Sequence, residues 1–174
     1  MHEVGGRPMI AHVLHAAAAA GVERTALVVA PDADWPAAFT GPESPITVYR
    51  QDEQLGTAHA VLCAKPALSD DRGAMVVLFG DNPLITGATI ARMLSRVEVG
   101  ADADVAVLAF RTDAPTGYGR VLVDDAGQVR AIREERDATP DERTVTLCNS
   151  GVLAVRGSVV LDALQAIGND NAKG

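Results

Sequence analysis

The first residue that could do chemistry is a carboxylate placed directly after an apolar run. Residues 74–79 read Ala-Met-Val-Val-Leu-Phe, and Gly80 and Asp81 follow. An unbroken apolar run with two valines is typical of a strand buried on both faces in a parallel sheet. Gly80 lets the chain turn, which leaves Asp81 at the strand's carboxyl end, where open α/β sheets bind ligands. Asp81 is a candidate for holding a metal ion or a ribose; the alternative is a turn residue that bonds its own backbone.

A polar loop at residues 51–59 is the second candidate. It leaves a predicted strand and enters a predicted helix through Gly56 and Thr57. The N–H groups and the positive dipole end at a helix start favour an anion. Gln51 carries both a donor and an acceptor, so it could read the edge of a base. The alternative is that Thr57 only caps the helix.

Three further polar groups lie in the C-terminal part of the chain. Residues 116–120, Thr-Gly-Tyr-Gly-Arg, lack the spacing of a phosphate-binding loop and favour a tight turn into a strand. Residues 134–137, Glu-Glu-Arg-Asp, are typical of a solvated strand end. Asn149, Ser150 and Gly151 interrupt an apolar strand, where Asn is disfavoured and Gly indicates a bulge or the close approach of a ligand.

The elements that must position these residues alternate along the chain. After a loop at residues 1–6, a helix is expected to begin near Pro8 and to end at Gly21. The remaining pattern predicts helices at 57–64 and 87–97, the latter capped by Thr86, and strands at 25–30, 46–49, 74–79 and 105–110. A short helix with Trp35 and Phe39 is expected to cover one edge. This order predicts an α/β fold with a mostly parallel sheet covered on both faces.

The pattern of predicted elements changes after Arg111. Residues 120–123 and 129–134 flank Asp-Asp-Ala-Gly, which predicts a β-hairpin, and residues 144–155 predict a further strand. We therefore expect one domain over residues 1–174, in which an antiparallel region (112–174) is attached to the parallel part (1–111). A crevice between the two would suit a site for two substrates.

Composition excludes several classes of protein. The chain has 174 residues, 48% of them hydrophobic, which fits one ordinary globular domain. Its longest apolar run is too short to span a membrane, and no signal peptide opens it. A net charge of −8 argues against a nucleic-acid binder. Cys63 and Cys148 have no metal-ligand or redox spacing and are expected to be two buried free thiols of a cytoplasmic protein.

Taken in order, these motifs resemble a known family. The segments QDEQLGTAHA, VLFGDNPLI, TGYGRV, IREERDAT, NSGV and NDNAKG, with the opening HEVGGRPMIAHVL, resemble the uridylyltransferase half of bacterial bifunctional N-acetylglucosamine-1-phosphate uridyltransferases/glucosamine-1-phosphate acetyltransferases. The resemblance covers essentially the whole chain. It implies the sugar-nucleotide pyrophosphorylase fold, a Rossmann-like α/β sheet with an added antiparallel β region that binds the sugar.

The resemblance also assigns roles to single residues. Gln51 and Gly56 match the pair that binds uracil, and Asp81 matches the catalytic aspartate that holds Mg²⁺. The positions that bind N-acetylglucosamine phosphate match Thr57, Gly119, Glu134 and Asn149.

The implied reaction is Mg²⁺-dependent uridylyl transfer from UTP to N-acetylglucosamine 1-phosphate, which gives UDP-N-acetylglucosamine, a precursor of peptidoglycan and lipopolysaccharide, and pyrophosphate. The protein supplies mainly positioning and charge neutralisation. Full-length members of the family are homotrimers.

The sequence also departs from the family. The glycine-rich loop that cradles the triphosphate, the lysine after it and the first strand are not in these residues. Beyond Gly174 would lie the asparagine that shares the metal and the acetyltransferase domain. Phe79 stands where tyrosine is common. We therefore expect little uridylyltransferase activity from these residues by themselves. A pyrophosphorylase for another sugar phosphate, and a sugar-nucleotide-binding module without activity, are the alternatives.

Overall fold

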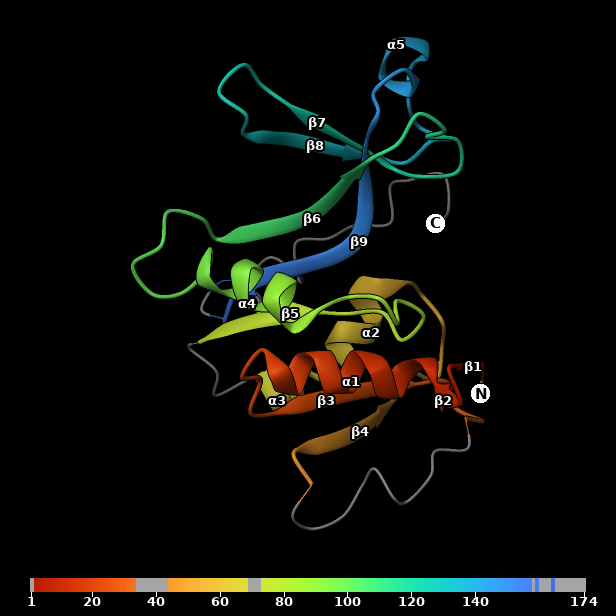
Figure 1. Cartoon of the computed structure of the whole chain (residues 1–174), viewed down its shortest axis with the longest axis vertical. Helices are drawn as coiled ribbons and strands as arrows, with labels where there is room; N and C mark the ends of the chain where they lie inside the picture. The colour runs from red at the N-terminus through yellow and green to blue at the C-terminus, as the bar shows by residue number, and fades with distance from the viewer. Residues whose placement is uncertain (1, 34–43, 69–72, 158, 160–163, 165–174) are drawn as a thin grey trace.

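The structure is a computed structural model that describes residues 2–33, 44–68, 73–157, 159 and 164 (Figure 1). The predicted helix with Trp35 and Phe39, most of the loop after it and the terminal segment NDNAKG lie outside these residues. In the part that is described, no helix is long and apolar enough to cross a membrane.

Helices and strands alternate through the first two thirds of the chain, as the sequence predicts. The helices are α1 (Met9–Ala19), α2 (Thr57–Cys63), α3 (Lys65–Leu68), α4 (Gly87–Ser95) and α5 (Pro140–Arg143). The strands are β1 (Glu3–Val4), β2 (Arg7–Pro8), β3 (Thr25–Val29), β4 (Ile46–Arg50), β5 (Ala74–Val77), β6 (Val105–Arg111), β7 (Arg120–Val123), β8 (Val129–Arg133) and β9 (Leu147–Arg156).

Local chemistry sets several of these boundaries. The Thr86 hydroxyl accepts a hydrogen bond from Thr89 N (3.2 Å), so α4 has the predicted N-cap. Gly21 has a φ of +83° directly after α1, a conformation that favours glycine and ends the helix. In the predicted hairpin of β7 and β8, the Asp124 carboxylate accepts hydrogen bonds from Ala126 N and Gln128 N.

Strand β9 is the centre of the larger sheet. It pairs with β5 on one edge and β6 on the other, both antiparallel, so β5 and β6 run in the same direction on either side of it. Its first half also meets β7, which forms the hairpin with β8. Strands β3 and β4 form a separate parallel pair. The predicted α/β class with an added antiparallel region is confirmed.

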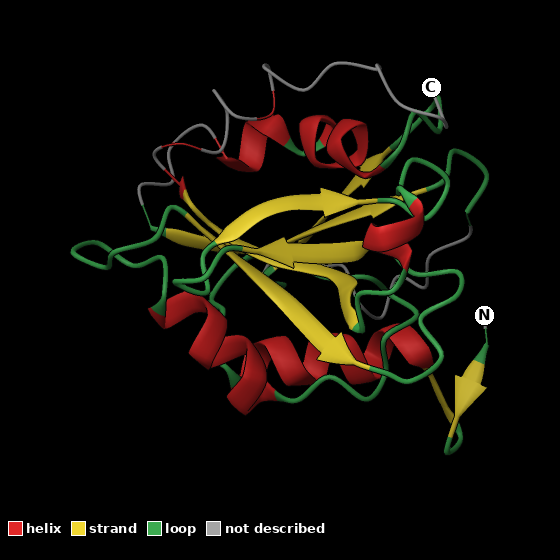
Figure 2. Ribbon diagram, turned by 90° about the horizontal axis from the view of Figure 1, so that it is seen from above, coloured by secondary structure: helices red, strands yellow, loops and turns green. Residues whose placement is uncertain are grey.

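The strands lie in a layer between helices (Figure 2). Helices α1 and α4 pack together on one side: a Cβ added to Gly87 would lie 2.9 Å from the Ala19 Cβ. The buried core cluster joins Met93 of α4, and Val97 just after that helix, to Val152 and Ala154 of β9. The core therefore sits over β9.

Three local predictions were wrong. Cys63 is only half-buried, although Cys148 is buried as predicted. Strand β5 is only half-buried at all four residues, although its sequence predicts burial on both faces. Residues 1–6 were expected to form a loop, but β1 and β2 form a small hairpin around Gly5 (φ +58°) and Gly6 (φ +76°). A pair of glycines with positive φ suits the tight turn between two antiparallel strands.

Candidate active site

Three of the predicted residues meet where β7, β8 and β9 come together. A Cβ added to Gly119 would lie 3.2 Å from Glu134 Oε1 and 3.7 Å from Asn149 Cβ. Asn149 N donates a hydrogen bond to Gly119 O (2.8 Å), which holds the turn before β7 against β9. We call Gly119, Glu134 and Asn149 the β-region cluster. Because the glycine carries no side chain, an acid and an amide face a common space.

A bulge in β9 shapes this cluster. The pairing with β6 shifts between Val107, opposite Leu153, and Ala109, opposite Asn149. The Ser150 hydroxyl donates to Leu108 O (2.7 Å), and Asn149 Oδ1 accepts from Gly151 N (3.0 Å). The Asn-Ser-Gly segment therefore forms the bulge that its sequence predicts, and its own side chains replace the missing ladder bonds.

The bulge also contacts the segment that carries Asp81. A Cβ added to Gly151, whose φ is +84°, would lie 2.9 Å from the Phe79 ring. Phe79 O accepts a hydrogen bond from Asn82 N (3.2 Å), so the chain turns sharply at Gly80 and Asp81. The exposed carboxylate of Asp81 thus lies in a turn that Phe79 anchors against β9.

The third group lies at the carboxyl end of β4. Gln51 Nε2 donates hydrogen bonds to Gly56 O (3.1 Å) and His59 Nδ1 (3.1 Å). Gly56 precedes α2 with a φ of +94°, which glycine adopts without strain. We call Gln51, Gly56 and Thr57 the loop cluster. Its three residues line a cavity of about 1560 Å³ that Phe79 and Gly80 also line.

The structure places six of the seven predicted residues in these two clusters, and Asp81 in the turn that directly follows Phe79 and Gly80. The segment 79–80 lines the cavity with the loop cluster, and Phe79 contacts the bulge beside the β-region cluster. Thr57, predicted to bind the sugar phosphate, lies in the loop cluster beside the uracil pair.

A buried arginine supports the β-region cluster and was not predicted. The Arg120 side chain is 2% exposed and donates hydrogen bonds to Tyr118 O and Arg143 O. Glu135 accepts a hydrogen bond from Gly117 N, and its carboxylate lies 4.0 Å from the guanidinium of Arg120. Arg120 and Glu135 therefore hold the turn that presents Gly119. The only indication of this role in the sequence is position. Arg120 directly follows Gly119 and Glu135 directly follows Glu134, and both preceding residues were assigned to the sugar site.

Among the predicted site residues, Asp81 is the one carboxylate that follows the end of β5 and could hold a metal ion. No group of three or more His, Cys, Asp and Glu residues that could hold a metal ion occurs in the described ranges. Mg²⁺ prefers oxygen ligands and keeps several waters, with one or two carboxylates and substrate phosphates completing its shell. A single exposed Asp81 fits that mode of binding.

Comparison with known proteins identifies the family of this chain. The MobA-like NTP transferase domain family matches residues 1–145. The whole chain is 51% identical to part of the bifunctional protein GlmU of Agrobacterium fabrum and 44% identical to part of that of Rhodospirillum rubrum. In both cases it spans 38% of the relative's length. The resemblance drawn from the motifs is confirmed.

A solved structure supports the fold. The CTP complex of CMP:2-keto-3-deoxy-manno-octonic acid synthetase superposes with a TM-score of 0.73 at 20% identity, over 97% of this chain and 71% of that one. The chain belongs to the MobA-like NTP transferase domain family and is a nucleotidyltransferase domain.

Proposed function

We propose that this domain serves Mg²⁺-dependent uridylyl transfer from UTP to N-acetylglucosamine 1-phosphate. The two polar clusters, together with the exposed carboxylate of Asp81 in the turn that Phe79 joins to the β9 bulge, support this proposal most directly. A nucleotidyl transfer needs a base and a sugar phosphate held on opposite sides of the reacting phosphorus, with negative charge neutralised between them. Under this proposal, the product is UDP-N-acetylglucosamine, a cell-wall precursor that is formed in the cytoplasm.

The loop cluster suits the nucleotide. The two hydrogen bonds from Gln51 Nε2 fix its amide plane, so Oε1 is oriented as an acceptor. Uracil offers one ring N–H flanked by two carbonyls, so an oriented acceptor beside a backbone N–H such as that of Gly56 can distinguish it from cytosine. The sharp turn at Gly56 brings the backbone close to the ligand, since no side chain intervenes.

The β-region cluster suits the sugar. The Glu134 carboxylate can accept hydrogen bonds from hydroxyl groups, and Asn149 can donate its amide N–H to a sugar or acetamido oxygen. Asn149 is oriented by the bond from Gly151 N to its Oδ1. The space above Gly119 admits the ring between the two side chains.

Asp81 would hold Mg²⁺, which neutralises phosphate charge when it is bound. The remaining residues act by position. An oxygen of the sugar phosphate forms a bond to the α-phosphorus of UTP, the bond from that phosphorus to the bridging oxygen breaks, and pyrophosphate leaves with the electron pair. No side chain of the protein needs to become covalently attached.

Ligand titration tests this proposal without requiring turnover. We expect UDP-N-acetylglucosamine, titrated with Mg²⁺ by calorimetry, to bind at least tenfold more tightly than UDP-glucose and than CDP. Glu134→Gln and Asn149→Ala should each weaken binding by about tenfold, the loss of one hydrogen bond to a polar ligand. Equal affinity for UDP-glucose, or no loss in either variant, would contradict the assigned sugar.

A rate measurement complements the titration. We expect uridylyl transfer by the 174 residues to be slow, since the family's triphosphate-binding loop is not among them. Removal of Mg²⁺ by a chelator should abolish whatever turnover remains. Turnover that survives chelation, or a rate equal to that of a whole family member, would contradict this part of the proposal.

A further inference from the structure

A histidine that is not one of the predicted site residues holds the side chain of Gln51. Gln51 directly follows β4, and His59 lies in the first turn of α2. The two side chains meet at 3.1 Å, between Gln51 Nε2 and His59 Nδ1. Both residues are half-buried, whereas Gly56 and Thr57 beside them are exposed. The contact therefore lies beneath the exposed part of the loop cluster.

The partners of the Gln51 amide fix the roles of all the atoms in this contact. Nε2 also lies 3.1 Å from Gly56 O, and a carbonyl oxygen only accepts hydrogen bonds. The atom beside Gly56 O is therefore the amide nitrogen and not Oε1. Because an amide nitrogen only donates, His59 Nδ1 must accept, which places the proton of a neutral imidazole on its Nε2. Both N–H groups of the amide are then occupied, so Gln51 presents an acceptor, Oε1, to a ligand.

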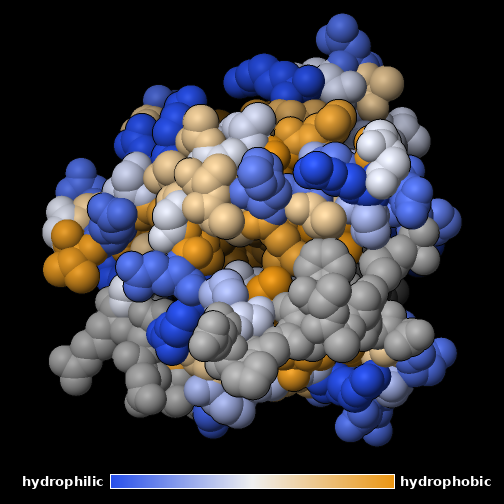
Figure 3. Space-filling view, turned by 60° about the horizontal axis from the view of Figure 1, so that its bottom comes forward, coloured by the Kyte–Doolittle hydropathy of each residue, from blue (hydrophilic) through white to orange (hydrophobic). Residues whose placement is uncertain are grey.

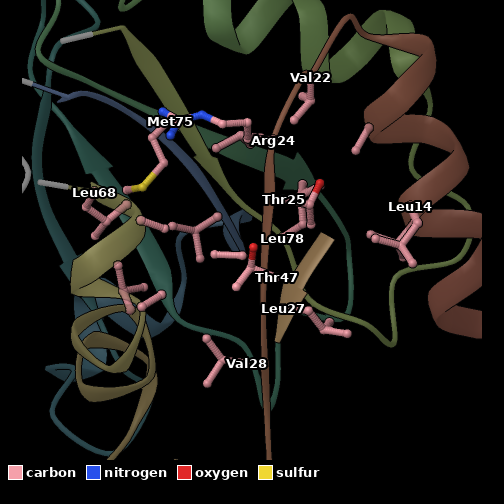
Figure 4. A pocket seen from close by; sticks show the side chains of 18 of the residues that line it. Leu14, Val22, Arg24, Thr25, Leu27, Val28, Thr47, Leu68, Met75 and Leu78 are labelled. Atoms are coloured by element: carbon pink, nitrogen blue, oxygen red, sulfur yellow. The ribbon is translucent and has the colours of Figure 1, made fainter. Parts of the chain in front are cut away.

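The imidazole acts from behind the glutamine. The loop cluster lines the cavity of about 1560 Å³, but His59 is not among the described residues that line it. Much of the wall is apolar: Figure 3 shows the hydrophobic hollow, and Figure 4 shows Leu27, Val28 and Leu68 among its side chains. An unpaired polar atom beside apolar groups costs free energy, so the atom that Gln51 presents decides which ligand atom can face it. His59 is therefore a positioning residue that acts through Gln51.

We propose that His59 sets the base selectivity of the nucleotide site, an inference that rests on the nucleotide role proposed for Gln51. With both amide N–H groups occupied, Oε1 can accept a hydrogen bond from the ring N–H of uracil. The corresponding ring nitrogen of cytosine carries no hydrogen and is itself an acceptor, so two acceptors would face each other. Without His59, one N–H of Gln51 is released. The amide can then swing about its remaining bond to Gly56 O and donate to cytosine.

Two variants of similar shape distinguish the hydrogen bond of the imidazole from its packing. His59→Leu removes the acceptor. His59→Asn keeps one, because the side-chain oxygen of asparagine is as many bonds from Cα as Nδ1 of histidine. His12→Leu is the control, since it removes an imidazole of α1 that donates to Val4 O (2.8 Å). Calorimetry with Mg²⁺ measures the affinity of each protein for UDP and for CDP, two ligands that differ only in the base.

We expect the preference for UDP over CDP to fall about tenfold in His59→Leu, the effect of one oriented hydrogen bond, and to be largely restored in His59→Asn. His12→Leu should keep the preference of the wild type, and thermal unfolding checks that each variant is folded. Full preference in His59→Leu would overturn the inference, and so would equal losses in the leucine and asparagine variants.

The wild type without nucleotide gives a second measurement. At about pH 8, where imidazole is neutral, the nitrogen NMR spectrum of the His59 ring should show a proton on Nε2 and none on Nδ1. A proton on Nδ1 would overturn the inference. Equal affinity of the wild type for UDP and CDP would overturn the nucleotide role of Gln51 and this inference with it. If instead the wild type and His59→Leu prefer UDP equally, only the role of His59 is wrong.

Discussion

At the scale of the residue, the proposed sugar site depends on the space above Gly119, between an acid and an amide. A methyl group at that position would lie 3.2 Å from Glu134 Oε1, the movable end of a flexible side chain. The protein can adapt by turning the carboxylate aside, so the fold tolerates the change. The ligand would then lose both the space and the oriented acceptor.

Gly119→Ala should therefore weaken ligand binding while it leaves the stability of the fold nearly unchanged. We expect the affinity for UDP-N-acetylglucosamine to fall at least tenfold, while the free energy of unfolding changes by less than about 1 kcal/mol, as for a small steric adjustment. Calorimetric titration and urea unfolding measure the two quantities. Gly127→Ala, at a positive-φ turn with open space around it, is the control that changes stability but leaves binding intact.

The Glu142 carboxylate gives the cap of α5 a dependence on pH. The pKa of Glu142 is lowered from 4.5, mainly because its carboxylate accepts the backbone N–H of Thr139 (2.8 Å), with the nearby Arg133 guanidinium adding to the effect. Since the folded-state pKa lies below the unfolded value, the charged cap stabilises the fold at pH values above about 4.5. Its contribution is lost as the pH falls through the folded-state pKa.

We expect Glu142→Gln to be less stable than the wild type at pH 7, with the difference shrinking as the pH falls to 3. The urea midpoint of both proteins at pH 7, 5 and 3 measures this trend. Thr139→Ala, which removes the hydroxyl of the same capping box, should cost about 1 kcal/mol at pH 7. If the difference in stability between the wild type and Glu142→Gln does not change with pH, the charge of Glu142 has no part in the cap.

At the scale of the element, the sequence indicates most of the fold because apolar runs and turn residues are local signals. The boundaries of α4 follow from Thr86, and the β7–β8 hairpin follows from the turn at Asp124. Helices of four residues such as α3 and α5 show no periodicity, so they escape prediction. The half-burial of β5 and the deep burial of Arg120 could not be predicted from the sequence for another reason. Both depend on which segments pack beside these residues.

The contact between Phe79 and Gly151 joins the Asp81 turn to the β9 bulge, and it should be sensitive to a single methyl group. Gly151→Ala adds a Cβ 2.9 Å from the ring and strains a φ of +84°. We expect a loss of about 2–5 kcal/mol, the sum of backbone strain and overpacking. Gly127→Ala, with φ +77° and no atom within 4 Å, should cost only the strain, about 1–2 kcal/mol.

A second substitution distinguishes crowding from strain. Phe79→Leu should destabilise the wild type but recover part of the loss in Gly151→Ala, because a smaller side chain leaves room for the methyl group. Urea unfolding of the four proteins forms a double-mutant cycle. Additive losses would mean that the ring and the bulge do not interact.

At the scale of the whole molecule, the order of the strands predicts which parts open first. Strand β9 is paired on both edges and carries the buried core, whereas β3 and β4, among the strands that the structure describes, pair only with each other. Amides in well-packed, doubly paired strands exchange through global unfolding, and others open locally. We expect Ala154 and Val155, which pair with both β5 and β6, to exchange slowest and the amides of β3 to exchange at least tenfold faster. Uniform protection, measured by NMR, would contradict this ranking.

The position of β9 in the sheet also determines whether the two predicted regions of the chain can fold separately. Its first half meets the β7–β8 hairpin, and its second half lies between β5 and β6. Residues 112–174 therefore supply the middle strand of the layer to which 1–111 belong, and the two predicted regions share one core. If a protease cut the loop after Arg111, the halves should migrate as a single complex on a sizing column, and neither piece should fold when produced alone.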